Sequence, residues 1–193
     1  MRLVPRLAVG ALAWALCATA LAAQDRALVV SVYGGGADHL ADLRSSPPAW
    51  FTPGYNIGAS VGMQLNQYFA VHGDFTFTRN PTRGVASIAG SDVNRFFYGA
   101  HLEARYPLTR GIAPFLFAGG GAVSVDQVGV DKFSPFTRPA LMYGGGLFYS
   151  LPQTNLELFG EVKGLTYRWN TAGFHRTMFD VTYSGGLSYR LPF

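Results

Sequence analysis

The residue types best suited to chemistry in this sequence are two histidines, His72 and His101, each followed two residues later by a carboxylate, Asp74 and Glu103. Imidazole and carboxylate groups together can ligate a metal ion or carry protons. Polar and apolar residues alternate around both histidines, which predicts that they lie on the polar faces of neighbouring strands. If the connection between the strands closes symmetrically, the histidines lie nearly opposite each other. We interpret them as hydrogen-bonded interior residues, with metal binding as the alternative, and predict no metal and no cofactor.

Charged residues recur on the same polar face along most of the chain. Because isolated charges are costly in a confined interior, an inward-facing set must form ion pairs. We expect a packed polar plug, and the alternative is a narrow pore gated by exchange of pairing partners. The predicted interior charge network comprises Asp74, Arg95, Glu103, Arg105, Glu157, Glu161, Lys163, Asp180 and Arg190.

The final segment shows the alternation most clearly. From Phe179 to Phe193 every odd position is apolar, aromatic or glycine, and every even position is polar, small or proline. A period of two is the pattern of a β-strand with two different faces. This length exceeds that of most strands in globular proteins, but it suits a tilted strand that crosses a membrane and continues beyond it.

In seven further segments apolar and polar residues alternate in a similar way. The connections between the segments are alternately long and short. The segments are 27–35, 53–65, 68–79, 94–106, 113–126, 139–151 and 155–168. The short connections are 66–67, 107–112 and 152–154, and the long ones are 36–52, 80–93, 127–138 and 169–177. The pattern predicts an all-β fold, an eight-stranded antiparallel up-and-down transmembrane β-barrel with short periplasmic turns and long external loops. We interpret the glycine triplets at 34–36, 119–121 and 144–146 as sites of close packing, not phosphate loops.

The first residues have the features of a secretory signal. Arg2 and Arg6 precede an apolar stretch from Leu7 to Leu21 that ends in small residues. We predict a signal peptide over 1–23, cleaved after Ala22 or Ala23, and a barrel domain over 24–193. Cys17, the only cysteine, is removed with the signal, so no disulfide is expected. The remainder has 13 basic and 11 acidic residues with no basic run, which argues against nucleic-acid binding.

Aromatic residues decide which face of the strands is outside. They gather near both ends of the apolar face, as in the aromatic girdles of membrane barrels. We therefore place lipid outside and the charges inside, against the alternative of a soluble barrel. The turn-side girdle is predicted to contain Tyr68, Phe69, Tyr106, Phe115, Tyr149, Tyr189 and Phe193, and the loop-side girdle Phe77, Phe96, Tyr98 and Phe179.

The chain resembles the eight-stranded outer-membrane barrels of the OmpA/OmpX type. The most specific element is the terminal strand, which is similar to the C-terminal signal read by the outer-membrane assembly machinery. The residues of this signal are Tyr183, Gly185, Leu187, Tyr189, Leu191 and Phe193. The resemblance implies export through the periplasm to the outer membrane of a Gram-negative bacterium, with lipid, lipopolysaccharide and the assembly machinery as partners. Because the sequence stops at Phe193, we expect no peptidoglycan-binding domain.

For function, we expect a structural or surface-interaction role carried by the external loops, with an extracellular ligand that remains to be identified. The alternatives are a narrow ion or small-solute channel and a lipid-modifying enzyme. The enzyme is disfavoured because His175 has no serine at a short strand spacing, so no catalytic residue is predicted. Trp50 and Phe51 suit either an adhesive patch or the upper girdle, and we favour the girdle. Two interpretations stay open for the arginines near the outer rim: contact with lipopolysaccharide phosphates, or ordinary solvated loop charge. These arginines are Arg79, Arg83, Arg138 and Arg176.

Overall fold

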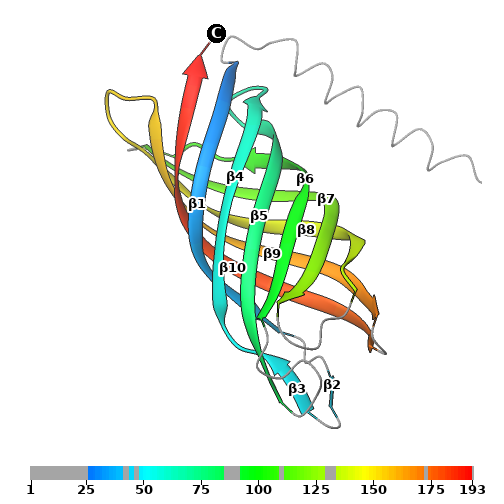
Figure 1. The fold of residues 1–193 in the computed structure, drawn as a ribbon. Helices are drawn as coiled ribbons and strands as arrows, with labels where there is room; N and C mark the ends of the chain where they lie inside the picture. The colour runs from blue at the N-terminus through cyan, green and yellow to red at the C-terminus, as the bar shows by residue number, and fades with distance from the viewer. Residues whose placement is uncertain are drawn as a thin grey trace, which may run out of the picture.

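Eight long antiparallel strands close into a barrel in the computed structural model (Figure 1). The structure describes residues 26–40, 44–45, 48–84, 92–108, 111–128, 134–171 and 174–192. The barrel strands are β1 (Ala27–His39), β4 (Gly54–Gln64), β5 (Phe69–Gly84), β6 (Asp92–Arg105), β7 (Ile112–Val128), β8 (Phe136–Ser150), β9 (Leu156–Thr171) and β10 (Phe174–Pro192). Each pairs with the next, and β1 pairs with β10 to close the ring. The predicted fold class is confirmed. No helix among these residues is long and apolar enough to cross a membrane.

The strands continue into regions that the sequence pattern assigns to loops. At one end of the barrel β1 reaches His39, which pairs with Asp180 of β10, and β5 reaches Gly84. Two short strands, β2 (Arg44–Ser45) and β3 (Pro48–Phe51), lie within the predicted loop 36–52, and β3 pairs with the end of β5. The prediction of strand-free loops there is wrong, because the extended segments find antiparallel partners beyond the alternating part of the sequence.

Short turns and the end of β10 lie at the opposite end of the barrel from β2 and β3 (Figure 1). In the turn between β4 and β5, the Asn66 Oδ1 atom accepts hydrogen bonds from the backbone amides of Tyr68 and Phe69, at 2.8 and 2.9 Å. Asparagine stabilises tight turns by this kind of side-chain to backbone bond. The end with short turns is the periplasmic end of outer-membrane barrels.

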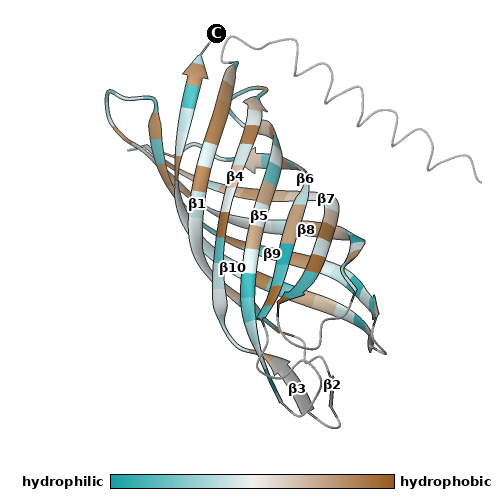
Figure 2. Ribbon diagram, viewed as in Figure 1, coloured by the Kyte–Doolittle hydropathy of each residue, from teal (hydrophilic) through white to brown (hydrophobic). Residues whose placement is uncertain are grey.

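The outer surface of the barrel is apolar, as the alternation predicts. On β10 Tyr183 and Leu187 are 52% and 45% exposed, whereas Ser184 and Ser188, the residues that directly follow them, are buried. Hydrophobic residues dominate the first part of β1, at the end of the barrel where the chain's C-terminus lies. Hydrophilic residues dominate β5 and β6 at the opposite end, near β2 and β3 (Figure 2). The outward apolar side chains therefore form a band that ends where β5 and β6 become polar.

The inner surface of β7 corrects one prediction. Phe115, Phe117, Val123 and Val125 all point into the barrel and are at most 5% exposed, while Leu116 is 70% exposed on the outside. Phe115 therefore does not belong to the turn-side girdle. Both faces of this strand are apolar, so alternation alone could not show which set is inside.

The interior is only partly the polar plug that we expected. Inward side chains of β4, β5 and β10 are mainly polar, whereas those of β7 and β8 are mainly apolar and pack against each other. The aromatic rings of Phe115 and Phe148 lie 4.4 Å apart, and those of Phe148 and Phe159 lie 5.4 Å apart. Apolar packing on one side of the barrel thus supports a charged network on the other.

Candidate functional site

Near the short turns, two arginines bind two carboxylates. Arg105 donates through Nη2 to Glu103 Oε1 at 2.7 Å and through Nη1 to Glu157 Oε2 at 3.0 Å. The Arg190 Nη2 atom lies 2.7 Å from the other oxygen of Glu157. The Arg105 guanidinium also lies over the Phe148 ring, 3.9 Å from its centre. These groups occupy the periplasmic part of the interior.

A second cluster crosses the middle of the barrel. The Lys163 Nζ atom of β9 lies 3.1 Å from Asp74 Oδ2 of β5 and 3.3 Å from Glu161 Oε1. It also donates to the Tyr33 hydroxyl oxygen at 2.8 Å, and that hydroxyl donates to Asp74 at 2.9 Å. The Lys163 ammonium is almost completely buried, so its charge is balanced by these two carboxylates.

A third cluster closes the loop end and corrects the interpretation of Phe51. The Phe51 ring is buried inside the mouth, with its centre 4.0 Å from that of His39 and 4.4 Å from the Arg95 guanidinium carbon. Arg95 and His39 both pair with Asp180, the former at 3.5 Å. Phe51 is therefore neither an adhesive patch nor part of a girdle, and the side chain of Trp50 lies outside the described residues.

One polar residue of β5 holds this mouth together. The Asn80 Nδ2 atom donates to the carbonyl oxygens of Ala37 and Thr52, at 3.0 and 3.1 Å, while its Oδ1 atom accepts from Arg95 at 2.9 Å. Trp169, which is 1% exposed, lies 6.3 Å from Phe51 between ring centres. The sequence pattern did not identify Asn80 or Trp169 as interior residues, because both lie in segments predicted to be loops.

The outer rim carries arginines on neighbouring strands. Arg168 of β9 and Arg176 of β10 line a cleft of about 300 Å³ together with Trp169, Asn170 and Thr177. Arg138 of β8 donates to the carbonyl oxygen of Asn170 at 3.2 Å, so a third arginine binds a residue of the cleft lining without lining the cleft itself. Elsewhere on the rim, Arg79 pairs with Asp92 and Arg83 is exposed.

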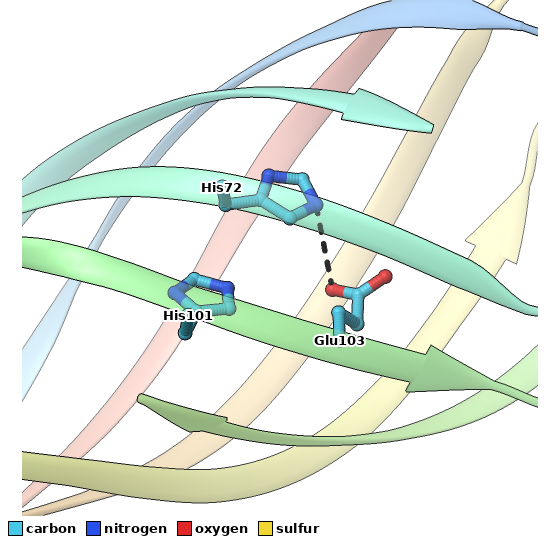
Figure 3. Close-up of side chains that lie close together, drawn as sticks. All are labelled: His72, His101 and Glu103. Carbon is cyan, nitrogen blue, oxygen red and sulfur yellow. Dashed lines mark ion pairs between the residues drawn. The ribbon is translucent and has the colours of Figure 1, made fainter. Parts of the chain in front are cut away.

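The histidine pair lies inside the barrel between the first two clusters. His72 of β5 and His101 of β6 are direct cross-strand partners, with nearly parallel rings whose centres are 5.1 Å apart (Figure 3). The His72 Nε2 atom faces Glu103 Oε2 at 3.9 Å. Asp74 instead binds Lys163. The structure thus brings His72, His101 and Glu103 together.

Both histidines lie in the interior, but one buried nitrogen of each ring lacks the hydrogen bond that their interpretation as hydrogen-bonded interior residues leads us to expect. Within the described part of the chain, the buried His72 Nε2 and His101 Nδ1 atoms have no hydrogen-bond partner. The other predicted interior charges all form ion pairs in the three clusters above. The ring nitrogens of His39 also lack hydrogen-bond partners, but that ring pairs with Asp180. His72 instead faces Glu103 only at 3.9 Å, and His101 forms no ion pair among the described residues.

Comparison with known proteins places this architecture in a family. Residues 9–192 match the outer membrane protein beta-barrel domain family. The chain belongs to this family. The barrel is accordingly a protein of the bacterial outer membrane, and its apolar band faces lipid in the lipopolysaccharide-containing envelope.

Solved outer-membrane barrels show the same fold at low sequence identity. Neisserial surface protein A is 14% identical, covers 85% of this chain and 96% of its own length, and has a TM-score of 0.60. Ail, the attachment invasion locus protein of Yersinia pestis, is 16% identical, covers 88% of this chain and all of its own, and has a TM-score of 0.50. No curated protein matches the sequence significantly.

The predicted assembly signal lies on the outer face of the last strand. Tyr183, Leu187, Tyr189 and Leu191 are exposed on β10, with Gly185 among them. Phe193 lies outside the described residues, as does the side chain of His175. Recognition by the assembly machinery stays a prediction.

Proposed function

We propose that this outer-membrane barrel is closed and acts at the cell surface, where its arginine cleft binds phosphate groups of lipopolysaccharide. The observation that carries the proposal is that two arginines on adjacent strands, Arg168 and Arg176, line one rim cleft, while Arg138 binds the backbone carbonyl of Asn170, another residue of the lining. Arginine is well suited to this task, because its planar fork of donors matches a phosphate and keeps its charge at any physiological pH.

The position of the cleft suits a lipid headgroup. On β9 the outward residues change from Leu158 and Val162 in the apolar band to Thr166 and Arg168 near the loop end. Arg168 therefore lies a few residues beyond the apolar band, where the phosphates of the outer leaflet begin. A lipid bound there would keep its acyl chains against the apolar wall and its phosphates in the cleft.

The closed interior supports a surface role over the channel alternative. Phe51, His39 and Trp169 fill the loop end, and the pairs of Arg105 and Lys163 occupy the rest of the polar side. An eight-stranded barrel is only wide enough for its own side chains, so these groups leave little room for a solute. We propose no catalytic role.

Binding of purified protein to lipopolysaccharide tests the proposal. In the Arg168→Gln/Arg176→Gln double variant we expect affinity to fall roughly tenfold or more, because each charge-assisted hydrogen bond contributes about 1.5–3 kcal/mol. Arg83→Gln is the matched control, since it removes an exposed rim arginine on the opposite side of the barrel, and should bind normally. The proposal fails if the double variant binds as the unmodified protein does, or if enzymatic removal of the lipid phosphates leaves binding unchanged.

A further inference from the structure

We propose that His72, His101 and Glu103 bind a divalent transition-metal ion inside the barrel. Each of the three offers one ligand atom, and these atoms all lie within 4.8 Å of one another. They come from adjacent strands at paired positions: His72 on β5, and His101 and Glu103 on β6 (Figure 3). The strand register therefore holds the three donors together without help from a loop.

The distances are those of a site that closes by small side-chain rotations. Zinc binds imidazole nitrogen and carboxylate oxygen at about 2.0–2.2 Å, so two ligands of one tetrahedral ion lie about 3.4 Å apart. The His72 Nε2 and Glu103 Oε2 atoms are already 3.9 Å apart. The two imidazole rings are nearly parallel, with 14° between their planes, so at least one ring must rotate about its Cβ–Cγ bond before both direct a nitrogen at one ion.

Unpaired ring nitrogens are the second observation that points to a ligand. Among the residues that the structure describes, His72 Nε2 and His101 Nδ1 are buried without a hydrogen-bond partner. A buried polar atom without a partner is costly, and native structures keep such atoms mainly for a functional reason or for a bound water or ion. A metal ion bound by one nitrogen of each ring would satisfy His72 Nε2, the nitrogen that faces Glu103.

Glu103 is oriented as a metal-ligating carboxylate is. Arg105 binds its Oε1 atom through Nε at 3.0 Å and Nη2 at 2.7 Å, which fixes the carboxylate and leaves Oε2 toward His72. Ligands of metal sites are commonly held by a second layer of hydrogen bonds of this type. Arg105 also binds Glu157, so its charge is shared with a second carboxylate.

The surroundings leave space for a further ligand. An internal cavity of about 20 Å³ is lined by the two histidines and Glu103, and this is enough for about one water molecule. Asp74 and Glu161 also line it, but both bind Lys163. Three protein ligands and one water would complete a four-coordinate site.

The donor set selects the class of ion. Two imidazole nitrogens and one carboxylate suit Zn²⁺, Ni²⁺, Cu²⁺ or Co²⁺, whereas Ca²⁺ and Mg²⁺ prefer oxygen ligands. Because imidazole must be deprotonated to bind, metal and protons compete for the site. We expect tighter binding at neutral than at acidic pH.

Metal binding to the purified, refolded protein in detergent micelles tests this inference directly. Zn²⁺ is titrated in competition with a chromophoric chelator, and Co²⁺ is added separately to record its visible absorption. We expect one ion per chain, cobalt bands typical of four or five ligands, and a higher unfolding temperature with Zn²⁺ but not with Mg²⁺. His72→Gln and His101→Gln should each weaken binding at least tenfold.

His39→Gln is the matched control, because His39 is also a buried interior histidine but belongs to the mouth cluster. It should retain the full affinity. Absence of Zn²⁺ and Co²⁺ binding by the unmodified protein overturns the inference, as does binding that survives in both His72→Gln and His101→Gln. If neither of these variants folds, the stoichiometry and cobalt spectrum of the unmodified protein decide the question.

Discussion

Lys163 and Asp74 form an ion pair across the full width of the barrel interior. Their strands, β9 and β5, are four positions apart in the ring of eight, and the Nζ atom lies 3.1 Å from Oδ2. Both side chains are at most 2% exposed. The pair therefore ties together opposite walls that share no backbone hydrogen bonds.

Removing this pair should destabilise the barrel. In Lys163→Met the Asp74 carboxylate would lose its main cationic partner in a buried site, so we expect the free energy of unfolding to fall by about 3–5 kcal/mol. Urea unfolding in micelles, followed by intrinsic fluorescence, measures the change. The Lys163→Met/Asp74→Leu double variant should recover part of the loss, because it removes the Asp74 charge and leaves only Glu161 without its cationic partner. A single variant as stable as the unmodified protein would contradict this role.

Close contact between β6 and β7 requires a residue without a side chain at Gly119. A Cβ atom there would collide with the carbonyl oxygen of Ala100 and the backbone of His101, so Gly119→Ala should destabilise by about 1–3 kcal/mol. Gly73→Ala is the control, since its Cβ atom would meet nothing nearer than 3.6 Å. Unfolding of the two variants under the same conditions measures the difference between their free energies of unfolding. Equal stabilities would show that β6 and β7 can move apart to accommodate the added methyl group.

Phe51 should shield the interior from water at the loop end. Of the three tryptophans, Trp14 lies in the predicted signal peptide, so changing Trp50 to phenylalanine leaves Trp169 as the only one in the predicted barrel domain. In that background Phe51→Ala should raise acrylamide quenching of Trp169 several-fold, because the Phe51 ring lies beside it. Phe77→Ala, on the outer surface, should leave quenching unchanged. Unchanged quenching in Phe51→Ala would mean that other groups close the mouth.

The sequence alone was sufficient for the fold and for much of the interior. Strict alternation from Phe179 onward placed each side chain of β10 on its correct face, because that strand has one polar and one apolar face. The near symmetry of the segment between His72 and His101 gave their pairing, which the strand register matches. These features depend on residues that are close together in the sequence, so the sequence pattern alone is enough to predict them.

Other features depended on the shape of the whole ring. Phe117 lies inside, where its ring packs against Gly144 of the neighbouring strand β8, a contact that no single strand records. Phe51 enters the mouth because β3 pairs with the end of β5, a contact set by tertiary structure. The arginine cleft likewise forms only when β9 and β10 are adjacent, which is why Arg168 was missed.

Electrical recording tests the central claim, that the barrel is closed and acts at its surface. Purified protein is reconstituted into lipid vesicles, which are then fused with a planar lipid bilayer. Insertion is verified by recovering folded protein from the same vesicles. We predict no conductance above that of the bare lipid, because Phe51, Lys163 and Arg105 occupy three successive levels of the interior. Steady unitary steps from the unmodified protein, altered by Lys163→Met, would contradict the account and establish a channel.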